Sequence, residues 1–172
     1  MSEFSRRIEL HAVDARLRHL EADEAERAAL AKRFGLVSID RLEADVELVQ
    51  DGTRVDASGT LVADIVQSCA VTGEDLPVAI REELAFRFVP ETATEPGSEE
   101  EIELDARALD ELPYQGTGFD LGEAVAQSLA LAIDPYAIGP NADAMRSEAG
   151  LLDEGSSGPF AALAALKGKQ DD

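Results

Sequence analysis

The sequence predicts an α+β fold in which an antiparallel β-sheet over about residues 41–90 packs against helices at about 22–34 and 120–133. Apolar and polar residues alternate through the first of these ranges, which indicates strands with one buried face. The links between the alternating runs are short, and short links favour an antiparallel meander. The other two ranges carry apolar residues at helical spacing and signals typical of helix ends.

The N-terminal part predicts an edge strand at residues 4–10, followed by the helix at 22–34. Asp23 and Arg27 stand four residues apart, in the acid-before-base order that stabilises a helix. Gly35 follows the last periodic residue, where a left-handed helix cap requires no side chain. The apolar stripe of this helix is expected to consist of Ala25, Ala28, Ala29 and Phe34.

Three alternating runs between residues 41 and 90 predict three strands. Asp51-Gly52 predicts a two-residue turn of type I′ between the first two strands, because both central positions of that turn need a positive φ. Gly59 marks a bulge or a point of close approach, and Pro90 ends the third strand. The predicted buried positions are Ala44, Val46, Leu48, Val55, Ala57, Leu61, Ala63, Ile65, Leu84, Phe86 and Phe88.

The segments that follow the strands differ in character. Residues 68–77 are small and polar and predict a turn, and the acidic residues 91–101 predict a mobile surface loop. Ile102 and Leu104 leave an extra strand as an open alternative.

The helix at 120–133 has the clearest start in the chain. Asp120 is an N-cap candidate, and Glu123 stands where its side chain would reach back to the cap amide in a capping box. Leu131 and Ile133 lie off the main apolar stripe, so we expect this helix to be covered on more than one side. The stripe itself consists of Leu121, Val125, Leu129 and Ala132.

The domain organisation predicted from composition is a single α+β domain over residues 1–138, a flexible linker over 139–158, and a short amphipathic helix with a tail over 159–172. The linker has room for one short helix at 142–149. The apolar face of the last helix fits either packing on its own domain or binding a partner, and it consists of Phe160, Leu163 and Leu166.

The chain is strongly acidic, with 36 Asp and Glu against 15 Lys and Arg and a formal net charge of −21. Residues 1–55 carry a net charge of −3 and residues 56–172 a net charge of −18. This excess of negative charge argues against a protein that binds nucleic acid through a broad cationic face or that binds anionic lipids. It favours a cationic partner for the second part, with solubility as the simpler explanation of the charge.

Little in the sequence favours catalysis or a bound metal. His11 and His19 stand eight residues apart, which does not match ligands on one helical face. Cys69 is the one cysteine, and the nearby Glu74 and Asp75 are expected to raise its pKa rather than activate it. We predict no enzyme, no cofactor and, because no signal peptide or apolar span is evident, a cytoplasmic location.

Three separated segments are distinctive. They are Cys69-Ala70-Val71-Thr72-Gly73-Glu74 with the strand ending at Pro90, Phe119–Tyr136 with the sequence FDLGEAVAQSLALAIDPY, and Pro159–Lys167 with the sequence PFAALAALK. Together they resemble the YceD family, described in bacteria as a large ribosomal RNA subunit accumulation protein. Residues 26–36 are similar to the alphaproteobacterial version. Many members carry a second cysteine where Thr72 stands, so a zinc ribbon is not expected here.

The resemblance implies a non-enzymatic role in accumulation or processing of large-subunit (23S) ribosomal RNA. The expected partner is a basic ribosomal protein or the large-subunit precursor particle, recruited by the acidic residues 74–111, with indirect contact to the RNA and no contact with a membrane. The alternative is a general acidic adaptor or holding chaperone, and a small metalloenzyme is a second rival. The oligomeric state stays open.

The resemblance also supplies the candidate interaction residues, which come from its three segments. The candidates are Cys69, Thr72, Gly73, Glu74, Asp120, Leu121, Gly122, Glu123, Asp134, Pro135, Tyr136, Pro159, Phe160, Leu163, Leu166 and Lys167. A separate set of cations could contact RNA or merely balance nearby acids, and it consists of Arg6, Arg7, Arg16, Arg18, Arg27, Lys32 and Arg33.

Overall fold

The computed structural model describes residues 2–91 and 110–149. The chain forms two compact units. The domain boundaries expected from composition stay predictions, since the tail after residue 149 lies outside the described residues. The first unit contains Met1–Gln67 and Pro77–Asp134, and the second contains Ser68–Leu76 and the chain from Pro135 onward.

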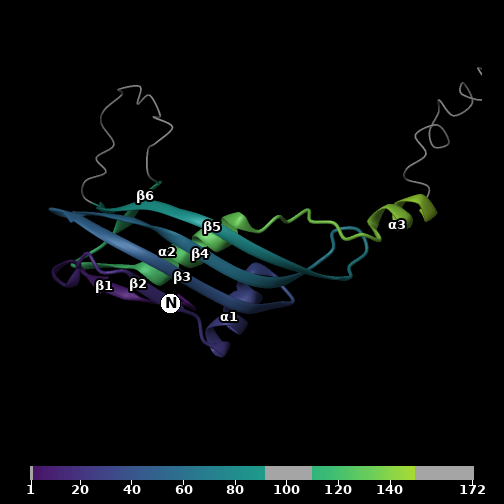
Figure 1. Ribbon diagram of the computed structural model, residues 1–172, viewed down its shortest axis with the longest axis horizontal. Coiled ribbons are helices and arrows are strands. Elements are labelled where there is room, and N and C mark those ends of the chain that lie inside the picture. The colour runs from purple at the N-terminus through teal and green to yellow at the C-terminus, as the bar shows by residue number, and fades with distance from the viewer. Residues whose placement is uncertain (1, 92–109, 150–172) are drawn as a thin grey trace, which may run out of the picture. The chain divides into compact units, whose positions relative to one another are not determined.

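The structure confirms an α+β fold, with a five-stranded sheet in the order β2-β3-β4-β5-β6 and a two-stranded sheet of β1 and β7 (Figure 1). The sheets are mostly antiparallel, and β6 joins β5 in parallel. The elements are β1 (Arg7–Glu9), the 3₁₀ turn η1 (Leu10–Ala12), β2 (Arg18–Glu21), α1 (Glu24–Phe34), β3 (Ser38–Asp51), β4 (Arg54–Ser68), β5 (Asp75–Pro90), β6 (Asp110–Tyr114), β7 (Gly118–Asp120), α2 (Leu121–Ala132) and α3 (Ala142–Glu148).

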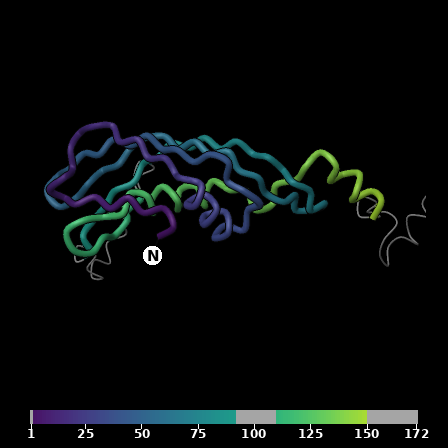
Figure 2. The backbone as a smooth tube through the Cα atoms, turned by 90° about the horizontal axis from the view of Figure 1, so that it is seen from below, coloured from purple at the N-terminus to yellow at the C-terminus, as the bar shows by residue number. Residues whose placement is uncertain are grey.

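One face of the five-stranded sheet forms the core of the first unit. The helices α1 and α2 and the β1–β7 pair lie on that face (Figure 2). Leu30 from α1 and Leu129 from α2 are fully buried against the sheet. Phe119 of β7 stacks on Phe88 of β5 with ring centroids 4.0 Å apart. The sheet is therefore apolar toward the helices, and no described helix covers its outer face.

The predicted meander is confirmed in β3 and β4, which pair antiparallel. The pairing begins with Ser38 opposite Val66 and ends with Asp51 opposite Arg54. All the core positions predicted for the three strands are buried. Gly59 is a point of close approach, because a Cβ there would overlap the backbone oxygen of Asp45. The register shift lies elsewhere, between Ile39 and Arg41 in the pairing of β3.

The turn between β3 and β4 differs from the prediction by one residue. Asp51 pairs with Arg54, so Gly52 and Thr53 form the loop. Gly52 has a φ of +62°, and every positive φ among the described residues belongs to a glycine. A type I′ turn at Asp51-Gly52 is therefore wrong, and the glycine occupies the first central position, as in a type II′ turn.

The helix predicted at 22–34 begins two residues later, because Asp23 is its N-cap. The Asp23 carboxylate accepts the Glu26 amide at 2.8 Å, and the Glu26 carboxylate accepts the Asp23 amide at 2.9 Å. This reciprocal capping box replaces the expected pairing of Asp23 with Arg27. Gly35 forms the predicted left-handed cap with a φ of +69°. The buried face was mispredicted, since Leu30 and Ala31 are buried whereas Ala25 and Ala28 are exposed.

The short strands β2, β6 and β7 were not predicted. The N-terminal strand predicted at 4–10 is limited to β1, although Phe4 and Ile8 are buried as expected. The predicted loop at 91–101 and the extra strand at residues 102–104 fall almost wholly outside the described residues. The link between β4 and β5 is shorter than expected, because β5 already begins at Asp75.

Candidate functional site

Most of the candidate residues that the structure describes fall in two groups, and Asp134, Pro135 and Tyr136 follow the end of α2. One group starts α2 in the first unit, and the other forms the β4–β5 turn in the second unit. The candidates in Pro159–Lys167 lie outside the described residues, as do residues 92–109 of the acidic region 74–111.

Asp120 organises the start of α2. Its carboxylate accepts the Glu123 amide at 3.1 Å, which confirms the predicted N-cap. The same carboxylate accepts the Arg6 amide at 2.8 Å and the Ser5 hydroxyl at 2.6 Å. The N-cap therefore also holds the N-terminal segment against α2. Leu121, next to it, is fully buried in the core.

Glu123 does not complete the predicted capping box. Its carboxylate accepts hydrogen bonds from the Arg33 guanidinium at 2.8 Å, from the Ser2 hydroxyl at 2.6 Å and from the Gln127 side-chain amide at 3.1 Å. The hydrogen bond from Arg33 is the main reason why the pKa of Glu123 falls to about 2. Burial of the carboxylate acts in the opposite direction and raises the pKa, but its effect is smaller. Glu123 therefore joins α2 to α1 and to the N-terminal segment.

Gly122 is required by the same junction. A Cβ at this position would overlap the backbone oxygen of Phe4 and come within 2.9 Å of the Arg6 nitrogen. The phenyl ring of Phe4 is fully buried, and the Leu121 amide donates to the Arg6 oxygen at 3.1 Å. The start of α2 thus holds the N-terminal segment in place, through hydrogen bonds to Asp120 and Glu123 and close backbone packing at Gly122.

The cations proposed for RNA contact are largely engaged by acids. The Arg6 guanidinium donates to both oxygens of Glu26, at 2.6 and 2.8 Å, and Arg33 also pairs with Glu3 at 2.9 Å. Arg18 pairs with Asp14 at 3.0 Å. These contacts favour the alternative in which the cations balance nearby acids.

Cys69 is the centre of the second group. Its thiol is buried at 4% exposure and accepts the Gly139 amide at 3.2 Å and the Thr72 amide at 3.5 Å. Two backbone hydrogen bonds close the turn. The Cys69 amide donates to the Glu74 carbonyl oxygen at 2.8 Å, and the Gly73 amide donates to the Cys69 carbonyl oxygen at 2.9 Å. Gly73 has a φ of +72°, which explains a glycine at this position.

The turn is tied to the segment after residue 135 within the second unit. The Ala70 amide donates to the Ala137 oxygen at 3.0 Å, and the Asn141 side chain donates to the Glu74 carboxylate at 3.1 Å. A small hollow of about 320 Å³ lies between the turn and this segment. It is lined by Cys69, Glu74, Asp75, Leu76, Gly139, Pro140 and Asn141.

The prediction that Glu74 and Asp75 raise the pKa of the Cys69 thiol is wrong. Hydrogen bonding from Thr72, followed by the backbone amide of Gly139, lowers the pKa of the thiol from 9.0 to about 6. Donors that point at sulfur stabilise the thiolate, and this outweighs the acids in sequence. Burial opposes the shift and limits access of a reagent to the sulfur.

Thr72→Val is expected to raise the pKa of Cys69, because it removes the hydroxyl that lowers this pKa most, although the same hydroxyl also donates to Glu74 at 3.1 Å. Thiolate absorbance in the ultraviolet, measured against pH with Cys69→Ala as the blank, gives the midpoint. Thr60→Val on the outer sheet face is the matched control and should leave the midpoint unchanged. An unchanged midpoint in Thr72→Val would contradict the assignment.

The remaining candidates stand at the end of α2. The Asp134 backbone oxygen accepts the side-chain amide of Gln67 at 3.0 Å, and Gln67 is itself buried. The helix ends at Ala132, before Pro135. Tyr136 is 81% exposed and Leu131 is 85% exposed, so Leu131 is not covered as predicted.

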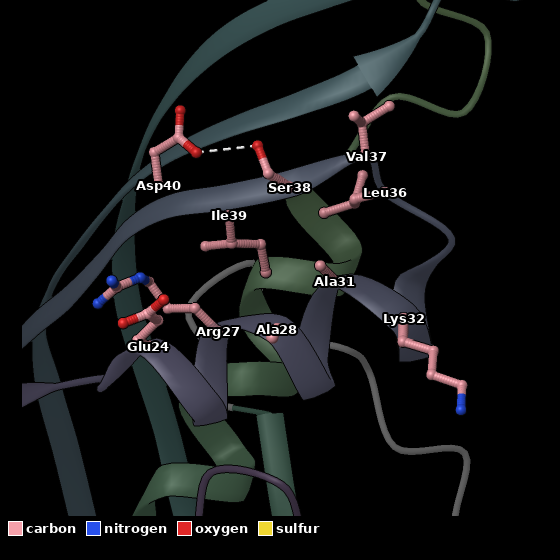
Figure 3. A pocket seen from close by; sticks show the side chains of 10 residues that line it. All are labelled: Glu24, Arg27, Ala28, Ala31, Lys32, Leu36, Val37, Ser38, Ile39 and Asp40. Carbon is pink, nitrogen blue, oxygen red and sulfur yellow. Dashed lines mark hydrogen bonds between the residues drawn. The ribbon is translucent and has the colours of Figure 1, made fainter.

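A hollow of about 670 Å³ lies between α1 and the start of β3 (Figure 3). Its floor is apolar, and Ile39 and Ala31 point into it. Glu24 and Arg27 lie together at one side, whereas Lys32 points away from it (Figure 3). The mixed charge gives this hollow no preference for an anionic ligand.

The outer face of the five-stranded sheet is acidic. Its carboxylates outnumber its arginines, and two of the arginines are already paired, Arg41 with Glu43 at 2.7 Å and Arg87 with Asp56 at 2.5 Å. The carboxylates of this face for which no ion pair with a described residue is found are Glu21, Glu47, Asp51, Asp64, Glu83 and Glu111.

Comparison with protein families finds one model, described as "Large ribosomal RNA subunit accumulation protein YceD", that matches residues 57–167. This range covers more than half of the chain and includes all three distinctive segments. The chain belongs to the YceD family. Neither curated proteins nor solved structures gave a match.

The YceD match begins within β4 and ends after the described residues, so it includes both candidate groups. In residues 2–91 and 110–149, no three His, Cys, Asp or Glu side chains gather as ligands for a metal. None of the helices in those ranges is long and apolar enough to cross a membrane. Within the described residues, the YceD match includes the hydrogen-bonded contacts of Asp120, Glu123 and Cys69 and the part of the acidic sheet face that lies after residue 57.

Proposed function

We propose that this YceD-family protein is a non-enzymatic ribosome-biogenesis factor that supports accumulation of large-subunit ribosomal RNA by binding a basic ribosomal protein or the large-subunit precursor. The family description carries the ribosomal part of this proposal. Of the residues that carry the family match, Asp120, Glu123 and Cys69 make structural contacts in the described part of the chain, and the acidic sheet face is the surface proposed to meet a partner.

The charge of the chain supports a basic protein as the direct contact. At a net charge of −21, association with an RNA backbone is opposed, whereas association with a cationic protein is accelerated. The cations that could offset this for RNA, such as Arg6 and Arg33, are held by Glu26 and Glu123. Contact with RNA is therefore indirect in this proposal.

Capture from lysate tests the proposal at two salt concentrations. We expect tagged protein to recover large-subunit ribosomal proteins or precursor particles at low salt and to lose most of them at high salt, because exposed charges are screened beyond about 8 Å at physiological ionic strength. Recovery of no ribosomal component at low salt would contradict the proposal.

Sucrose-gradient profiles of cells that lack the chain provide the second readout. We expect a reduced large-subunit peak that is restored by the wild-type gene. A normal large-subunit level together with capture of many unrelated basic proteins would favour a general acidic adaptor or holding chaperone instead.

A further inference from the structure

The edge of β5 is only partly used. β5 runs from Asp75 to Pro90, and β6 pairs with it only over Phe86–Pro90. In the described part of the chain, no strand pairs with Val78–Ala85 on the β6 side. A strand edge of this length presents a row of backbone donors and acceptors to any extended segment that approaches.

A groove with both polar and apolar lining lies beside the Glu82–Ala85 part of this free edge. A hollow of about 270 Å³ lies between the edge of β5 and the last turns of α2. Leu84 and Phe86 belong to the core side of β5, and Leu131 and Ala132 come from α2. The Leu131 side chain is 85% exposed in this groove, so it contributes almost nothing to the core.

The rim of the groove is acidic. Glu82, Glu83 and Asp110 line it and are exposed. None of these three makes an ion pair with a described residue. Two copies of the chain would bring these rims together at a net charge of −21 each, which disfavours a second copy as the occupant.

We infer that the free edge of β5 binds an extended, Lys- or Arg-containing segment of a basic protein as an added strand. The backbone of that segment bonds to Val78–Ala85, its apolar side chains enter the groove beside Leu131, and its cations meet Glu82 and Glu83. Strand addition combines main-chain hydrogen bonds with side-chain selection at alternate positions. The inference rests on the proposed function for the class of partner.

A labelled peptide of alternating valine and lysine is the probe, with fluorescence anisotropy and hydrogen exchange as readouts. We expect binding to the full chain and slower exchange of the Val78–Ala85 amides that point away from β4. Leu131→Ser is expected to weaken binding at least five-fold, whereas Val49→Ser, at a residue 56% exposed on the outer face of β3, should change it less than two-fold. Both side chains are exposed, so both variants are expected to fold.

Charge reversal separates this edge from the general acidity of the sheet. The pair Glu82→Lys with Glu83→Lys is expected to weaken binding at least five-fold more than the charge-matched pair Glu21→Lys with Glu47→Lys. Equal weakening by the two pairs would overturn the edge site and leave the proposed function intact.

Three further results would also overturn the edge site. They are absence of peptide binding, protection in the free protein of those Val78–Ala85 amides that point away from β4, and a dimer that dissociates in Leu131→Ser. Conversely, a peptide bound as expected, with no ribosomal component captured from lysate, would retain the edge site and contradict the proposed function.

Discussion

Gly122→Ala is expected to lower the free energy of unfolding by about 3 kcal/mol, the upper part of the range for overpacked sites. The added Cβ would overlap the backbone oxygen of Phe4, and backbone cannot move aside as a flexible side chain can. Either α2 or the N-terminal segment must shift, which disturbs the hydrogen bonds from Ser5 and Arg6 to Asp120.

Urea denaturation of the full chain measures this loss. Gly52→Ala is the control, because Gly52 has a φ of +62° but open space around it. Its expected cost is about 1 kcal/mol, from the left-handed backbone alone. A Gly122→Ala protein no less stable than the control would show that the N-terminal segment does not depend on close contact with α2.

Glu123→Gln is expected to cost about 2 kcal/mol near neutral pH and almost nothing in strong acid. The folded pKa of Glu123 is about 2, below the ordinary value of 4.5, so its ionised form stabilises the folded state. This contribution is fully present above pH 4.5 and is lost as the pH falls through about 2. The expected loss of about 2 kcal/mol is smaller than the free energy that corresponds to the full pKa shift, because the Glu123 side chain is 24% exposed and water screens its charge.

The measurement is the difference in unfolding free energy between wild type and Glu123→Gln across a pH series. Glu47→Gln removes the same charge from the exposed outer face of β3 and serves as the control. A difference that stays constant down to the acid end of the series would contradict the role of the Glu123 carboxylate.

The long strands could be predicted because their signal is local. In β3 apolar and polar residues alternate from Leu42 to Leu48, and in β4 the buried positions recur at every second residue from Leu61 to Ile65. The strands β1, β2 and β7 have only three or four residues, and their pairing partners lie elsewhere in the chain. Strand propensity in such short runs depends on tertiary context, so the pattern alone does not reveal them.

The candidate site shows the same division between local and distant signals. The cap by Asp120 was predictable, since donor and acceptor lie three residues apart. The partner of Glu123 is Arg33, 90 residues earlier, and nothing in the spacing indicates it. Likewise, the acids beside Cys69 were visible in the sequence, whereas the amide of Gly139 was not.

The pairing of β1 with β7 has a consequence for synthesis of the chain. Arg7–Glu9 leave the ribosome early, but their partner Gly118–Asp120 emerges more than a hundred residues later. Until then the apolar side chains of Phe4 and Ile8, both buried in the finished fold, remain unprotected. Contacts between such distant segments slow folding and prolong exposure to aggregation. These two side chains can therefore reach their buried positions only after β7 and α2 have been made.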